Sequence, residues 1–242
     1  MATTAVAVKR PVHPDRIFFP LLCGLMLLLV WFGFSKTYYA AGMVHAKLPS
    51  PTIHVHAIAA TLWLITLIVQ IGLISARKVK LHMTVGLWGF SLAAAWVVIA
   101  MAAALDALRR NMSPPGSGLD PLTFFIVPVT GAGLFAWFAG WSYLARRTPQ
   151  AHKRLIMIAT IAILDAAVGR FPYTVWPSLT GLKQSLVLFV LLAAIMVYDL
   201  ITLKRIHRAT WIPALALIVV HLTRIPFGQT HLWMRFAAMC QG

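Results

Sequence analysis

Long apolar runs alternate with short polar and basic segments along the 242 residues of this chain. A helix needs about 20 mostly apolar residues to cross the hydrocarbon core of a bilayer. Seven stretches reach or approach that length, at residues 17–35, 54–75, 85–105, 122–144, 154–168, 182–203 and 210–227. The fifth is the shortest, and because Arg170, Pro172 and Pro177 follow it, it is expected to run one turn further or to bend at the outer surface. The pattern predicts an all-α integral membrane bundle of seven transmembrane helices.

The connecting segments are short. The longest cover residues 36–53 and 106–121, and neither is large enough to fold separately, so residues 1–242 are expected to form a single transmembrane domain. The first apolar stretch lacks a small-residue cleavage site and is expected to be retained as a helix.

The distribution of Lys and Arg predicts the orientation. Seven spans place thirteen of these residues on the side of the N-terminus: Lys9, Arg10, Arg16, Arg77, Lys78, Lys80, Arg146, Arg147, Lys153, Arg154, Lys204, Arg205 and Arg208. Eight fall on the other side: Lys36, Lys47, Arg109, Arg110, Arg170, Lys183, Arg224 and Arg235. Because positive charge in short loops stays in the cytoplasm, the N-terminus is predicted to be cytoplasmic and the C-terminus to lie outside.

Composition supports lipid as the main solvent. Hydrophobic residues make up 60% of the chain and charged residues 11%, against about 25% charged residues in a soluble domain. The net charge of +16 would suggest nucleic acid as the partner of a soluble protein. Here the cations sit in clusters between apolar runs, so they indicate membrane anchoring and no nucleic-acid partner. The two cysteines, Cys23 and Cys240, form no recognisable metal or disulfide motif.

One face of the second span carries polar and aromatic residues. His56, Trp63 and Gln70 recur every seven residues, so they project along one side of the helix. Polar groups within a bilayer usually face the interior of the bundle. This face is either a packing seam, in which Gln70 bonds to a neighbouring helix, or the lining of a pocket.

Asp165 is the sharpest single feature because it lies about 18 Å into the fifth span. A carboxyl group there should be neutral or should pair with a cation. Arg170, His221 and Arg224 lie at comparable depths. With Gln70, these residues are predicted to form a buried polar cluster, which is either a structural ion pair or part of a functional site.

Histidines at the two sides of the membrane are candidate cofactor ligands. His82 and His152 stand beside basic residues at cytoplasmic helix ends, where they either contact lipid phosphates or form a bis-imidazole pair for haem. With His56 and His221, they make up the predicted set of haem ligands. A zinc site formed by His54, His56, Asp165 and His221 is an alternative, although His54 and His56 point in nearly opposite directions if both are helical.

Several of these residues carry a family resemblance. They occur in the order His56, Trp63, Gln70; His82, Gly86, Gly89; His152-Lys-Arg-Leu155, Asp165, Arg170-Phe-Pro172; Tyr198-Asp-Leu200, His207. This order resembles a widespread bacterial family of polytopic membrane proteins over roughly residues 18–210. The resemblance implies a multi-pass protein of the bacterial cytoplasmic (inner) membrane and implies no particular chemistry. The arrangement of histidines is also loosely similar to that of two-haem transmembrane cytochromes.

These observations lead to three functional expectations. The first is a membrane redox component that binds b-type haem and exchanges electrons with quinone. The second is an accessory or structural subunit of a larger membrane complex, since nine Trp and thirteen Phe on a small bundle offer lipid- and partner-facing surface. The third is a metal-dependent membrane hydrolase. No residue is singled out as catalytic.

Overall fold

The computed structural model describes residues 14–113, 118–171 and 182–242, and this part of the chain contains helices and turns but no strand. The helices are α1 (Asp15–Phe34), η1 (Ser35–Tyr39), η2 (Met43–His45), α2 (Pro51–Ser75), α3 (Val79–Arg109), α4 (Pro121–Phe124), α5 (Ile126–Leu144), α6 (Pro149–Ala162), α7 (Asp165–Val168), α8 (Leu182–Leu203), α9 (Arg208–Gly228) and α10 (His231–Gln241). The protein is therefore all-α, as its hydropathy pattern predicts.

Six helical segments of the described chain are long and apolar enough to cross a membrane. They are Asp15–Tyr39, Pro51–Ser75, Val79–Arg109, Pro121–Leu144, Gln184–Leu203 and Arg208–Gly228. Their outward surface carries large apolar side chains, such as Trp88 (73% exposed) and Val190 (68% exposed). Because soluble proteins rarely expose contiguous apolar surface of this kind, the protein is a multi-pass membrane protein whose helices contact the lipid bilayer.

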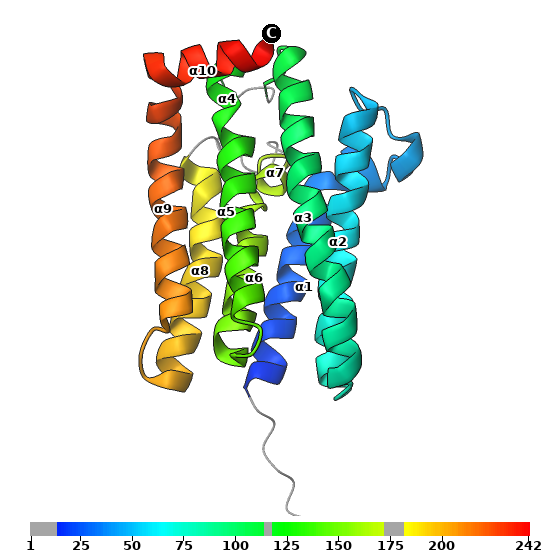
Figure 1. Ribbon diagram of the computed structural model, residues 1–242, viewed down its shortest axis with the longest axis vertical. Helices are drawn as coiled ribbons and strands as arrows, with labels where there is room; N and C mark the ends of the chain where they lie inside the picture. The colour runs from blue at the N-terminus through cyan, green and yellow to red at the C-terminus, as the bar shows by residue number, and fades with distance from the viewer. Residues whose placement is uncertain (1–13, 114–117, 172–181) are drawn as a thin grey trace, which may run out of the picture.

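The long helices run side by side along the long axis of the bundle (Figure 1). The start of α1 and the turns α2–α3, α5–α6 and α8–α9 gather at one end, while α4 and α10 lie at the other. The three turns carry Arg77 and Lys78, then Arg146 and Arg147, then Lys204 and Arg205. We call this end of the bundle the basic end.

The segment expected as the fifth span differs from the expectation. It consists of the 14-residue helix α6 and the four-residue helix α7, separated by a turn at Ile163 and Leu164. The amide of Ile163 donates to Thr160 (3.2 Å) and that of Leu164 donates to Ile161 (3.1 Å), so the bonding tightens from four-residue to three-residue spacing. The break places Asp165 in the first turn of a new helix.

Helix α6 occupies the centre of the bundle, packed against α5, α8 and α9. Leu155, Ile158 and Ile161 are fully buried, and so is the charged side chain of Arg154. A helix that is buried all round cannot satisfy a charge with water. Whatever pairs with Arg154 must therefore come from a neighbouring helix.

Two glycines allow close contact between helices. A Cβ atom at Gly33 of α1 would lie 2.2 Å from the carbonyl oxygen of Ala167 in α7, and one at Gly89 of α3 would lie 2.9 Å from Cγ2 of Thr66 in α2. Small residues at such crossings are typical of membrane helix packing.

A terminal helix that hydropathy did not predict, α10, lies across the end of the bundle opposite the basic end (Figure 1). Nε1 of Trp233 donates to the carbonyl of Leu122 (2.9 Å), and Nε2 of Gln241 donates to Oδ1 of Asn111 (2.7 Å). Leu232 and Met239 are more than 70% exposed on its other face. The helix is short and amphipathic, which is why a search for long apolar runs passes over it.

Candidate functional site

His82 and His152 face each other near the basic end. Each is the fourth residue of its helix, in α3 and α6 respectively. Their ring centroids are 6.3 Å apart, and the ring planes cross at 84°. The two residues that the sequence analysis proposed as a bis-imidazole pair are thus brought together by the fold.

Ser142 of α5 holds the ring of His152. Nδ1 of His152 donates to the carbonyl oxygen of Ser142 (3.1 Å), while Oγ of Ser142 lies 3.0 Å from the same nitrogen and donates to the carbonyl of His152 (3.1 Å). Because a carbonyl oxygen only accepts, the proton of a neutral His152 sits on Nδ1. Nε2 then carries the lone pair. Histidines that bind a metal are usually held in this way, with one ring nitrogen donating to the protein and the other binding the metal.

Gln70 of α2 contacts His82 in a similar way. Its amide nitrogen donates to the carbonyl of His82 (3.1 Å) and to Nδ1 of His82, and its amide oxygen accepts from the backbone N–H of Gly86 (2.8 Å). Because the amide N–H donates to Nδ1, a neutral His82 carries its lone pair on Nδ1 and its proton on Nε2. Turning the amide over would place its oxygen against the carbonyl of His82 and its N–H groups against the N–H of Gly86, so these contacts favour this one tautomer.

This position of Gln70 corrects its expected membership of the Asp165 cluster. Gln70 lies at the basic end because it is fourteen residues along α2 from His56, a rise of about 21 Å. The intermediate residue of the same face, Trp63, contacts Phe135 and donates from Nε1 to Oγ1 of Thr160 (3.4 Å), so this part of the face is a packing seam.

Aromatic rings cover one side of the histidine pair. The ring of Phe90 lies 6.1 Å from that of His152 and 5.1 Å from that of Tyr143. These rings keep the site apolar, although basic residues surround the nearby turns.

A buried ion pair fixes α6 beside the site. Nε of Arg154 donates to Oδ1 of Asp199 in α8 (2.7 Å), Nη2 donates to the same oxygen, and Nη1 donates to the backbone carbonyl (2.8 Å) and Oε1 (2.6 Å) of Gln150. Oδ2 of Asp199 accepts from the amide of His207 (3.0 Å) and from the hydroxyl of Thr210 (2.6 Å). Both charged side chains are fully buried. This network joins α6, α8 and α9 at the basic end.

The pair of Arg154 and Asp199 was not predicted from the sequence, because Arg154 was counted among the cations at the cytoplasmic end of the fifth span. The signal that could have found this pair is the scarcity of acids. The chain has only five acidic residues, all of them Asp, so an Asp within an apolar stretch is expected to pair with a cation. Asp15, at the start of α1, also pairs with a cation. Its Oδ2 lies 2.5 Å from Nζ of Lys153, and its Oδ1 accepts from the hydroxyl of Tyr198 (2.6 Å).

Asp165 lies at the other end of the central helices. Its Oδ2 is 2.9 Å from Nε2 of His221 and 2.5 Å from Nη1 of Arg224. The expected contact with helix α9 is therefore present. Arg170, which was expected in the same cluster, donates to the carbonyl of Ala166 (2.6 Å) and lies 4.7 Å over the ring of Phe34.

Both ring nitrogens of His221 face acceptors. Nδ1 lies 2.9 Å from the carbonyl oxygen of Leu217, and Nε2 faces the carboxyl group of Asp165. A proton must therefore sit on Nδ1 and another between Nε2 and Oδ2 of Asp165. Since Oδ1 of Asp165 and Nε of Arg224 are buried without a partner among the described residues, the cluster is only partly satisfied.

The remaining histidine candidates have separate surroundings. The ring of His56 lies 5.5 Å from that of Trp96, and its buried Nδ1 has no hydrogen-bond partner among the described residues. His54 is half-buried near the start of α2. In the described part of the chain, no three His, Cys, Asp or Glu side chains come together as a metal-ligand group. Of the proposed zinc ligands, Asp165 and His221 are in contact.

Comparisons with protein-family models, with curated proteins and with solved structures found no match for this chain.

Proposed function

We propose that the protein is a membrane redox component that binds a b-type haem between His82 and His152. The observation that carries this proposal is the 6.3 Å separation of the two imidazole centroids. Two imidazoles on opposite sides of one metal ion, with metal–nitrogen bonds of roughly 2 Å, hold their ring centres about 6 Å apart. At this spacing, His82 and His152 would be able to hold one iron between them.

The donor chemistry also fits. Two neutral imidazoles are suitable axial ligands of a low-spin haem, and a bound haem would supply one-electron redox chemistry. Ser142 fixes the ring of His152 with Nε2 available, whereas Gln70 holds the ring of His82 through Nδ1, so His82 would have to release the proton of Nε2 to bind a metal through that atom. Phe90 packs against the ring of His152 and Tyr143 packs against Phe90, which gives one side of the pair apolar surroundings.

The proposed topology places this site in the cytoplasmic half of the membrane. We infer seven crossings, with α6 and α7 together forming the fifth, a cytoplasmic N-terminus and an external C-terminus. The basic turns at one end of the bundle support this orientation. A reporter enzyme fused after Gly242 should be active only outside the cytoplasm. Reporter activity in the cytoplasm would mean that α6 and α7 together do not cross the membrane, so that the chain has six crossings.

Membership of the bacterial inner-membrane family and electron exchange with quinone remain parts of the same proposal. Its decisive test is an absorbance spectrum of protein produced with ample haem, oxidised and then reduced with dithionite. We expect a Soret band, and after reduction a sharp α-band of a bis-histidine haem. Absence of both bands from folded protein would refute the proposal.

Variants make this test specific. His82→Ala and His152→Ala should each abolish the low-spin spectrum, because one axial ligand is lost. His45→Ala is the matched control, since His45 is an exposed histidine of η2, and it should keep the full spectrum. Ser142→Ala should retain haem more weakly, by about 10-fold or more, as found when the partner that orients a metal-bound histidine is removed.

A further inference from the structure

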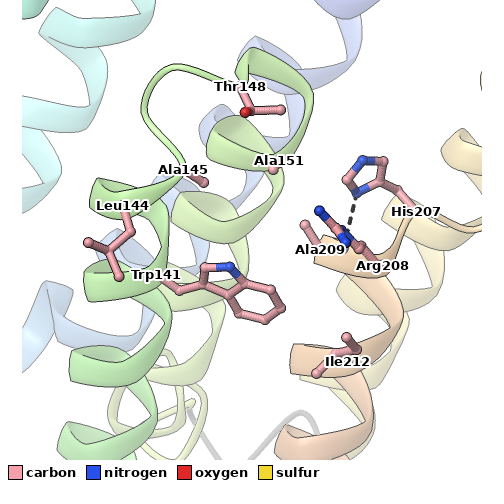
Figure 2. A pocket seen from close by; sticks show the side chains of 9 residues that line it. All are labelled: Trp141, Leu144, Ala145, Thr148, Ala151, His207, Arg208, Ala209 and Ile212. Carbon is pink, nitrogen blue, oxygen red and sulfur yellow. Dashed lines mark hydrogen bonds between the residues drawn. The ribbon is translucent and has the colours of Figure 1, made fainter.

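A groove at the basic end opens between α5, α6 and α9. Its cavity of about 550 Å³ is lined by Trp141, Leu144, Ala145, Thr148, Ala151, His207, Arg208, Ala209 and Ile212 (Figure 2). A second cavity of about 580 Å³ shares Trp141, Leu144 and Ile212 and continues along α5 past Trp137, Gly140 and Ala136. The groove therefore runs from a polar mouth to an apolar tail.

We propose that this groove binds one anionic glycerophospholipid, with the phosphate at Arg208 and the acyl chain along α5. The site is separate from the histidine pair, and the inference does not depend on a haem there.

The polar mouth has donors but no acid. Arg208 is exposed and forms no ion pair with the described residues, and Thr148 is exposed beside it. Nδ1 of His207 accepts from the amide of Ala209 (3.0 Å), which Figure 2 shows as a dashed line. Through this hydrogen bond His207 caps the start of α9. The bond turns the ring towards the mouth of the groove and occupies Nδ1, so Nε2 remains for a ligand. Burial, and then the nearby cation of Arg154, lower the pKa of His207, and because Nδ1 of the neutral ring accepts, Nε2 carries the proton and is a donor.

No acid of the protein can neutralise Arg208. The nearest carboxylate in the network is Asp199, which already accepts from Arg154, His207 and Thr210. The other acid at this end, Asp15, is paired with Lys153. Arg208 is therefore available to an anion from outside the chain, and at this level of a bilayer the available anions are lipid phosphates.

Small residues leave space for a ligand both at the mouth and in the tail of the groove. Alanines at positions 145, 151 and 209 surround the mouth, and a Cβ atom added at Gly140 would meet nothing within 4 Å. Figure 2 shows the indole of Trp141 lying across the gap towards α9. Trp side chains are enriched at this depth because they combine an apolar ring with a polar N–H. The shape and chemistry fit a headgroup with an acyl chain.

The test is retention of lipid by native mass spectrometry, after reconstitution of the full chain in nanodiscs of equal phosphatidylglycerol and phosphatidylcholine. We expect one phosphatidylglycerol to be retained in preference to phosphatidylcholine. Arg208→Gln should lower this retention about fivefold through loss of one cation. Gly140→Leu should lower it at least as much, because the new side chain fills the tail.

Matched controls separate the groove from general charge and packing effects. Arg16→Gln removes an exposed Arg of α1 at the same end, and Gly133→Leu fills open space two turns away on the same face of α5. Neither should change retention. Equal losses in the control variants, equal retention of the two lipids, or retention of a quinone added to the nanodiscs in place of the lipid would each overturn the proposal.

Discussion

Asp199 offers the sharpest test of how the bundle is held together. Substitution by Ala would leave the guanidinium of Arg154 buried without an anion, since both side chains are fully buried. Breaking a buried ion pair by removing one partner costs about 3–5 kcal/mol. The same substitution orphans the amide of His207 and the hydroxyl of Thr210, and each buried unsatisfied group costs roughly 1–3 kcal/mol. The sum is comparable with the whole stability of a typical domain.

We therefore expect Asp199→Ala to prevent accumulation of folded protein. Asp199→Asn keeps an oxygen acceptor but loses the charge, and should lower the thermal unfolding midpoint in detergent by about 6–20 °C, at 2–4 °C per kcal/mol for a chain of this size. With the half-buried Cys240 replaced by Ser, the midpoint can be followed with a thiol-reactive dye, because Cys23 is buried in the folded state.

The matched control is Asp106→Asn. Asp106 accepts from Nε of Arg110 (3.0 Å) and from the hydroxyl of Ser50 (2.5 Å), but the Asp106 and Arg110 side chains are 22% and 46% exposed. Exposed ion pairs contribute about 0–1 kcal/mol, so its midpoint should shift by a few degrees at most. If Asp199→Asn shifts the midpoint no more than Asp106→Asn does, the buried network does not stabilise the bundle as argued here.

Two further predictions concern the other end of the bundle and the crossing of α1 with α7. Asp165→Leu should cost about 3–5 kcal/mol, because it leaves Arg224 and His221 without their acceptor, whereas Asp165→Asn should cost less; equal unfolding midpoints for the two variants would contradict the ion pair. Gly33→Ala should lower the midpoint by an amount equivalent to about 1–3 kcal/mol through overpacking against α7. Gly24→Ala, where a Cβ meets nothing within 4 Å, should leave the midpoint unchanged or raise it; a loss as large as that of Gly33→Ala would rule out the close crossing.

The amino-acid sequence by itself determines that the chain is helical and that most of its helices are long enough to span a bilayer, because these properties depend on the local density of apolar residues. It also indicates that a carboxyl group as deep as Asp165 needs a partner, because the cost of an isolated charge in lipid does not depend on the fold. The contact of Asp165 with α9 follows that reasoning. The division of the predicted fifth span into α6 and α7 does not follow from hydropathy, and neither does α10, which is too amphipathic for a hydropathy search.

Only the tertiary structure decides which side chains meet. It places Gln70 against His82, buries Arg154 in a pair with Asp199, and opens the groove beside Arg208. In a soluble protein, the apolar stripe of a helix shows which face is buried. Here lipid and core are both apolar, so the sequence pattern says little about how each helix is rotated. Rotation is decided by the small residues and buried polar partners that neighbouring helices bring together.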